Sequence, residues 1–134
     1  MGSITTRLRI AAWEENPVAE FDDGSKITRA SVTLSDGVDG LEAGTIESVM
    51  YYRPDGTSHY VNVMRLTAVL DGRSGSVVLA GDGAYDGMTA SGSASVVPDS
   101  ATGSLVGITG TCTSTSTQAD YPFMPLALEY DFSG

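Results

Sequence analysis

The chain has 134 residues, of which 41% are hydrophobic, and this composition suits one compact domain spanning residues 1–134 rather than a disordered segment. Its 17 Asp and Glu residues outnumber 7 Lys and Arg residues, which gives a net charge of −10. Such a surface repels phosphate backbones and anionic lipids, so we expect neither nucleic acid nor membrane partners.

Period-two alternation and turn residues predict an all-β chain. The expected strands are residues 7–13, 27–34, 44–53, 58–70, 76–85, 88–97, 109–117 and 126–132. On the first strand, Leu8, Ile10 and Ala12 are expected on one face. Residues 14–26 are predicted to form a loop, because Pro17 and the Asp22-Asp23-Gly24 stretch break the alternation.

The stretch from residue 51 to 78 gives the strongest fold signal. Pro54-Asp55-Gly56 and Asp71-Gly72-Arg73-Ser74-Gly75 are turn sequences, since proline presets φ and glycine accepts a positive φ. A run rich in valine, tyrosine and threonine lies between them. Three antiparallel strands in a meander are predicted here, and Asp86-Gly87 indicates a further hairpin.

Two later segments leave alternatives open. Residues 98–107 are expected to be a connection with room for one helical turn. Residues 109–117 alternate threonine with small residues, which favours a strand because threonine is β-branched, although a mobile linker also fits. About eight short strands fit either a sandwich or an up-and-down antiparallel barrel, and closure favours the barrel because it removes exposed edges.

The chain has one cysteine and one histidine, which argues against disulfides and zinc sites. Cys112 has no partner for an intrachain disulfide, so no oxidising compartment is needed, and with His59 as the sole histidine we expect no zinc site and no cofactor. The N-terminus lacks the apolar stretch of a signal peptide, and no run is long enough to span a bilayer. The expected location is the cytoplasm.

Short stretches spread over nearly the whole chain form a series. They are Trp13-Glu14-Glu15-Asn16-Pro17, Lys26-Ile27-Thr28-Arg29-Ala30, Tyr52-Arg53-Pro54-Asp55-Gly56-Thr57, Gly72-Arg73-Ser74-Gly75-Ser76, Val97-Pro98, Gly103-Ser104-Leu105-Val106-Gly107 and Tyr130-Asp131-Phe132. In this order the series resembles a bacterial family of small proteins with a domain of unknown function, placed among the allene oxide cyclase-like barrels.

The resemblance implies a calycin-type barrel related to the lipocalins, and self-association as in the plant cyclases, so a homo-oligomer is left open. It also implies that any chemistry is a cofactor-free rearrangement or cyclisation of an apolar ligand inside the barrel. Members of the family often carry Glu where Met64 stands, so the resemblance implies a more apolar cavity here, without that acid–base group.

One face of the 58–70 strand is predicted to line the interior, because Arg65 and Thr67 on the other face are more easily left in solvent. The candidate catalytic residues are Tyr52, Tyr60 and Asn62, which can hydrogen-bond a carbonyl or hydroxyl of a ligand. The candidate ligand-binding residues are Ser48, Met50, Met64, Leu66, Leu79, Cys112, Leu126, Leu128 and Tyr130. The alternative is that the tyrosines are wall residues and that the methionines fill a core.

Three other features receive plainer interpretations. His59 is a candidate general base, but a solvated surface histidine is favoured because the sequence places no carboxylate beside it. Cys112 is interpreted as a small buried hydrophobe. The acidic residues Glu14, Glu15, Glu20, Asp22 and Asp23 are interpreted as a solvated loop, since they lack the spacing of a calcium-binding loop.

Two functions fit these features. One is a cofactor-independent cyclase or isomerase for a polyene- or polyketide-like metabolite, in which a shaped cavity holds the substrate in a reactive conformation. The other is a barrel that binds a hydrophobic small molecule without chemistry. A barrel whose interior is filled by side chains alone would support neither function.

Overall fold

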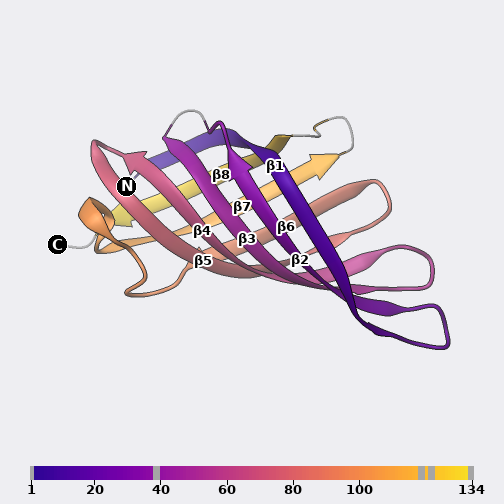
Figure 1. Cartoon of the computed structure of the whole chain (residues 1–134). Coiled ribbons are helices and arrows are strands. Elements are labelled where there is room, and N and C mark those ends of the chain that lie inside the picture. Colours follow the sequence, from indigo (N-terminus) through magenta and orange to yellow (C-terminus); the bar gives the residue numbers. More distant parts are fainter. Residues whose placement is uncertain (1, 38–39, 118–119, 121–122, 133–134) are drawn as a thin grey trace.

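The computed structural model describes residues 2–37, 40–117, 120 and 123–132. These residues form eight antiparallel strands and one 3-10 helix, and the strands close into a barrel in sequence order, β8 pairing with β1 (Figure 1). The elements are β1 (Gly2–Glu20), β2 (Lys26–Ser35), β3 (Leu41–Tyr52), β4 (Ser58–Leu70), β5 (Arg73–Tyr85), β6 (Thr89–Val96), η1 (Gly103–Leu105), β7 (Ile108–Thr117) and β8 (Phe123–Phe132). The prediction of an all-β chain of about eight antiparallel strands that close on themselves is confirmed.

Turn-forming residues explain where β4 ends and β5 begins. β4 has the bounds that the sequence predicts, and it is joined to β5 by the two residues Asp71 and Gly72, whose φ angles are 52° and 76°. Positive φ at both positions is the requirement of a type I′ hairpin turn, which glycine meets without strain. The turn is therefore shorter than predicted, and Arg73–Gly75 already belong to β5.

The loop predicted for residues 14–26 is wrong, because β1 continues to Glu20 and only residues 21–25 form the turn. Among the described residues, β1 pairs with β8 only from Gly2 to Arg9 and then with β2 alone. A strand with one unpaired edge accepts proline, because that side of the backbone makes no ladder hydrogen bonds. Pro17 therefore lies inside the strand, opposite Thr28.

A β-bulge at Ala11 changes which side of β1 faces inward. Ile10 pairs with Leu34 and Ala12 with Thr33, so Ala11 is an extra residue without a partner in the ladder. From this bulge to a second one at Val18 the inward residues are odd-numbered, because Trp13 pairs with the buried Val32 and Pro17 with the buried Thr28. The prediction that Ala12 shares the face of Leu8 and Ile10 is therefore wrong.

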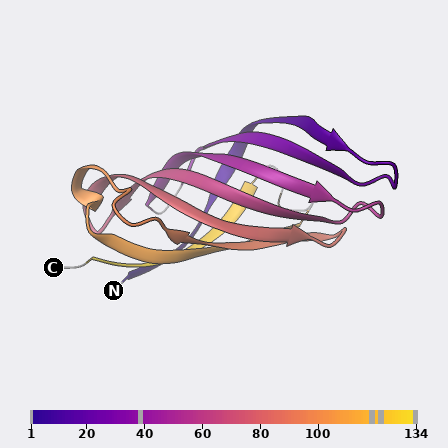
Figure 2. The same cartoon turned by 90° about the horizontal axis from the view of Figure 1, so that it is seen from below.

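The two ends of the barrel differ in shape. The hairpins β1–β2, β3–β4 and β5–β6 project together beyond one end, which we call the mouth, while both termini lie at the opposite, closed end (Figures 1 and 2). The connection from β6 to β7 contains η1, which confirms the predicted helical turn, and its Leu105 is fully buried against the closed end. β7 is a strand, as predicted, rather than a linker.

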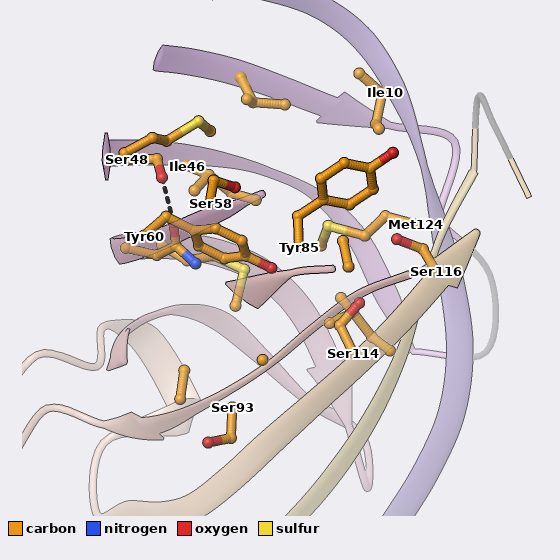
Figure 3. Close-up of a pocket in the computed structure, with 18 of the residues that line it drawn as sticks. Ile10, Ile46, Ser48, Ser58, Tyr60, Tyr85, Ser93, Ser114, Ser116 and Met124 are labelled. Carbon is orange, nitrogen blue, oxygen red and sulfur yellow. Dashed lines mark hydrogen bonds between the residues drawn. The ribbon is translucent and has the colours of Figure 1, made fainter. Parts of the chain in front are cut away.

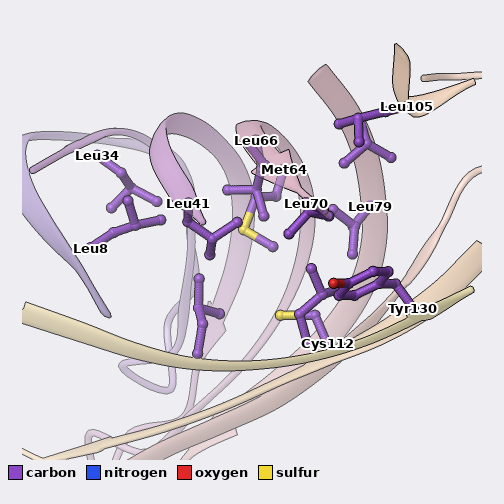
Figure 4. Close-up of a cluster of buried hydrophobic side chains, with 14 of the residues drawn as sticks. Leu8, Leu34, Leu41, Met64, Leu66, Leu70, Leu79, Leu105, Cys112 and Tyr130 are labelled. Carbon is purple, nitrogen blue, oxygen red and sulfur yellow. The ribbon is translucent and has the colours of Figure 1, made fainter. Parts of the chain in front are cut away.

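The hydrophobic core occupies the closed end (Figure 4). Leucines from several strands and from η1 meet there without solvent exposure: Leu8, Leu66, Leu79 and Leu105 each have an exposed fraction of 0%. Burying a leucine side chain contributes about 1.5–3 kcal/mol to folding. The closed end therefore supplies much of the stability of the barrel, so the residues near the mouth are less constrained by core packing.

Candidate functional site

A cavity of about 320 Å³ lies between the closed-end core and the mouth. It is lined by side chains from all eight strands, whose surface is mainly apolar, with serine and tyrosine hydroxyls and the Asn62 amide among them (Figure 3). This volume lies at the lower end of the range of about 300–1,000 Å³ typical of small-molecule sites. The barrel interior is therefore only partly filled by its own side chains.

The structure brings most of the predicted site residues to this cavity. Those that line it are Ser48, Met50, Tyr52, Tyr60, Asn62, Met64, Cys112 and Leu126. Leu66, Leu79, Leu128 and Tyr130 do not line it and instead belong to the closed-end core. The reason is depth: they share the inward face of their strands but lie nearer the end that leucines fill.

Small side chains on β6 and β7 create the empty space. The inward residues there are Ala90, Gly92 and Ala94, together with Cys112, Ser114 and Ser116. Sequence reasoning missed most of these, and it also missed Ile10, Trp13, Val32, Ile46, Ser58, Tyr85, Ser93 and Met124. The signal was visible as alternating small residues, but both faces of β6 are small, so the pattern could not indicate which face turns inward.

Two neighbouring hydrogen-bond donors on β4 are available to a ligand in the cavity. The buried Ser48 hydroxyl donates to Asn62 Oδ1 over 2.6 Å, which leaves the Asn62 amide NH₂ free to donate to a ligand (Figure 3). Burial raises the pKa of the Tyr60 phenol, and no hydrogen-bond partner for its hydroxyl is found in the part of the chain that the structure describes. Both groups lie on β4, two residues apart and on the same face.

Tyr60 is positioned by a glycine on the next strand. Tyr60 pairs with Gly83 of β5, and a Cβ atom built on Gly83 would lie 2.6 Å from the Tyr60 ring. Any larger residue at position 83 would displace the ring, so glycine there sets the direction of the phenol.

Glu15 joins the aromatic residues at the mouth, on the inner face created by the bulge. Its carboxylate accepts hydrogen bonds from Trp13 Nε1 (3.0 Å), Thr28 Oγ1 (2.7 Å) and the Tyr52 hydroxyl (2.8 Å). The interpretation of Glu15 as part of a solvated loop is therefore wrong. Because the Tyr52 proton is donated to Glu15, Tyr52 offers a ligand only its oxygen lone pairs and its ring.

The contacts of Glu15 and Tyr52 determine the charge of each side chain. Burial opposes ionisation of Glu15, but the hydrogen bonds from Thr28, Tyr52 and Trp13 and the nearby Lys26 outweigh it, so the pKa of Glu15 lies below its ordinary value of 4.5. Burial and the hydrogen bond to Glu15 raise the pKa of Tyr52 to about 12. At neutral pH the pair is a carboxylate and a neutral phenol.

The remaining reactive side chains take no part in the cavity's polar chemistry. Burial raises the pKa of the Cys112 thiol to about 11, so it lines the cavity as a neutral, small hydrophobe. His59 lies on the outer face of β4, where its Nε2 is 3.3 Å from Asp82 Oδ2, so a carboxylate does lie beside it, but away from the cavity. No group of three or more metal-binding side chains occurs within the described ranges, and none of the helices described there could span a membrane.

The lowered pKa of Glu15 predicts a pH-dependent contribution to stability. A folded-state pKa below the unfolded value stabilises the fold above about pH 4.5, and this contribution is lost as the pH falls through the folded-state pKa. We expect the Glu15→Gln variant to lose less unfolding free energy than the wild type between pH 5 and pH 3. Urea unfolding at both pH values measures this, with Glu14→Gln on the opposite face as the control. Equal losses in wild type and Glu15→Gln would contradict it.

Comparison with known proteins places the chain in a family. Residues 4–130 match the family described as "Protein of unknown function (DUF3224)". The chain belongs to this family. A crystal structure of a DUF3224 protein of unknown function from Shewanella oneidensis MR-1 is similar in fold, with a TM-score of 0.78 and 22% sequence identity over 100% of this chain and 99% of that chain. No match was found among curated proteins.

Proposed function

We propose that the protein binds a mainly apolar small molecule in the barrel cavity and holds one oxygen of that ligand with Asn62 and Tyr60. The observation that carries this proposal is the cavity of about 320 Å³, whose largely apolar wall carries two neighbouring donors on β4, the Asn62 amide and the Tyr60 phenol. Ligand pockets typically combine an apolar lining with a few placed polar groups. A ligand with a carbonyl or hydroxyl oxygen at one point of an apolar frame meets both requirements.

The pairing of Ser48 with Asn62 supports this role. An amide whose oxygen is already bonded is held in one orientation, so its NH₂ group faces the cavity before a ligand arrives. Such preorganisation reduces the entropy lost on binding.

The proposal is tested with N-phenyl-1-naphthylamine, a neutral dye that becomes fluorescent in apolar sites, and with its displacement by 2-nonanone. Changing Ser48→Ala and Asn62→Leu together removes the amide donors without leaving the buried Ser48 hydroxyl unpaired. We expect the double variant to bind the dye like the wild type and to bind 2-nonanone about 2- to 10-fold more weakly, since one hydrogen bond is lost. His59→Ala, on the outer face, is the control and is expected to change neither affinity. Failure of the dye to bind the wild-type protein would overturn the proposal.

A cofactor-independent cyclase or isomerase acting on a polyene- or polyketide-like metabolite is a second candidate for the same cavity. The observation that favours it is the Tyr60 phenol, which is neutral at neutral pH, whose pKa burial raises further, and which can donate a hydrogen bond to negative charge developing on a substrate oxygen. The apolar wall would fold the substrate into a reactive conformation. Because isomers share one mass, the test is chromatographic separation of products, and loss of turnover in Tyr60→Phe with retained ligand affinity is the expected result.

An allene oxide cyclase-like, calycin-type relationship belongs to the same proposal. It is supported by the meander of eight antiparallel strands and by an interior that is apolar at one end and hollow at the other. The ligand class and the finer fold relationship are tested by separate experiments. Ligand binding tests the first, and comparison of barrel geometries tests the second.

A further inference from the structure

An ionised carboxylate lies beside the cavity, in contact with two of the residues that line it. Trp13 and Tyr52 line the cavity, and both donate hydrogen bonds to Glu15, which the bulge at Ala11 turns toward the inner face. A ligand that enters past these residues removes water from the carboxylate. Removing water from an ionised carboxylate is unfavourable, whereas an opposite charge on the ligand would compensate.

The side chain of Lys26 already places a cation beside Tyr52 and Glu15. The Lys26 ammonium lies 5.2 Å from the centroid of the Tyr52 ring, and its charge contributes to keeping Glu15 ionised. A cation within about 6 Å of an aromatic ring centroid is attracted to the ring face. Lys26 is exposed, so its ammonium is free to move back into solvent when another cation takes its place.

The surrounding turns add to the negative potential. The hairpin turns at the mouth (residues 21–25, 53–57 and 86–88) and the strand residues that flank the first of them carry the acidic residues Glu20, Asp22, Asp23, Asp55 and Asp86, against the basic residues Lys26 and Arg53. Their summed field concentrates cations at the mouth and repels anions. The net charge of −10 on the whole chain acts in the same direction.

We infer that the ligand is a cationic amphiphile, whose apolar body fills the cavity and whose amine or quaternary ammonium group lies at the mouth between the Glu15 carboxylate and the rings of Trp13 and Tyr52. This inference rests on the proposed function and deepens it. The donors on β4 and the Glu15 carboxylate would then recognise two different groups of one molecule.

The test compares three compounds with the same tail: octyltrimethylammonium, 1-octanol and octanoate, each displacing N-phenyl-1-naphthylamine below its micellar concentration. We expect the cation to bind about tenfold more tightly than 1-octanol, and octanoate to bind most weakly. Trp13, the single tryptophan of the chain, supplies a second readout, because its fluorescence should respond to a cation at the mouth.

Glu15→Gln is the decisive variant, since glutamine keeps the shape of the side chain and an acceptor for Tyr52. It should abolish the preference for the cation, so that octyltrimethylammonium and 1-octanol bind this variant with similar affinity. Glu14→Gln removes the same charge from the neighbouring residue, whose side chain is exposed on the other face, and should retain the preference. Lys26→Met removes the competing cation, so it should strengthen binding of octyltrimethylammonium, and this result does not depend on the folding of the Glu15 variant.

The outcomes separate the two proposals. Equal affinities of the wild type for the cation and for 1-octanol overturn the cationic ligand but keep the apolar site. Equal effects of Glu14→Gln and Glu15→Gln also overturn it, because net charge alone would then explain the preference. Absence of binding by all three compounds and by the dye overturns the proposed function itself.

Discussion

Met64→Trp is expected to abolish binding of apolar ligands. Met64 lies where the cavity meets the closed-end core, so a larger side chain extends into the empty space that a ligand would use. We expect the affinity for N-phenyl-1-naphthylamine to fall by at least roughly 100-fold, which corresponds to about 3 kcal/mol of binding free energy. Displacement titrations measure the loss.

The fold of this variant should survive, because the new ring enters a void rather than a packed region. Met64→Leu is the matched control, since a volume-conserving change is well tolerated and should leave ligand affinity nearly unchanged. Thermal unfolding of both variants checks the fold. A Met64→Trp variant that is folded and still binds the dye like the wild type would show that the cavity is not the ligand site.

Leu79→Ala is expected to produce the largest loss of stability. Leu79 has an exposed fraction of 0% and belongs to the leucine core of the closed end. Removing its side chain leaves a cavity that the rigid barrel wall cannot collapse to fill, so the free energy of unfolding should fall by about 2–5 kcal/mol. Urea unfolding at neutral pH measures the difference.

Val63→Ala provides the control for this change. Val63 lies on the outer face of β4 with an exposed fraction of 54%, so its truncation should change the unfolding free energy by no more than about 0.5 kcal/mol. A Leu79→Ala variant as stable as Val63→Ala would mean that the closed end does not hold the barrel together.

The sequence predicts the strands best where turn residues bound a segment of strand-forming residues. β4 has the predicted bounds because the Pro54-Asp55-Gly56 turn precedes it, the Asp71-Gly72 turn follows it, and valine, tyrosine and threonine, which favour strands, recur between them. β1 was predicted too short because alternation fails at the bulge and proline normally interrupts strands. The sequence pattern does not reveal that β1 pairs with β2 alone beyond Arg9 in the described part of the chain, nor that Ala11 is an extra residue in the strand.

The candidate site could be predicted only in part, because alternation gives the face of a residue and not its depth. Asn62 and Leu66 share one face of β4, yet Asn62 lines the cavity and Leu66 lies in the core. Their difference depends on side chains of other strands and on Leu105, which the β6–β7 connection inserts at the closed end. Glu15 was missed for a different reason: its inward position depends on the bulge.

The pairing of the first and last strands also determines how the protein can be handled. Gly2 pairs with Tyr130, so the two ends of the described chain leave the barrel side by side, at the end away from the mouth (Figure 1). Fusion partners or surface tethers attached there would leave ligand entry unobstructed. A short linker between the two ends, with new termini opened at the Asp71-Gly72 turn, would give a circular permutant whose binding site is untouched.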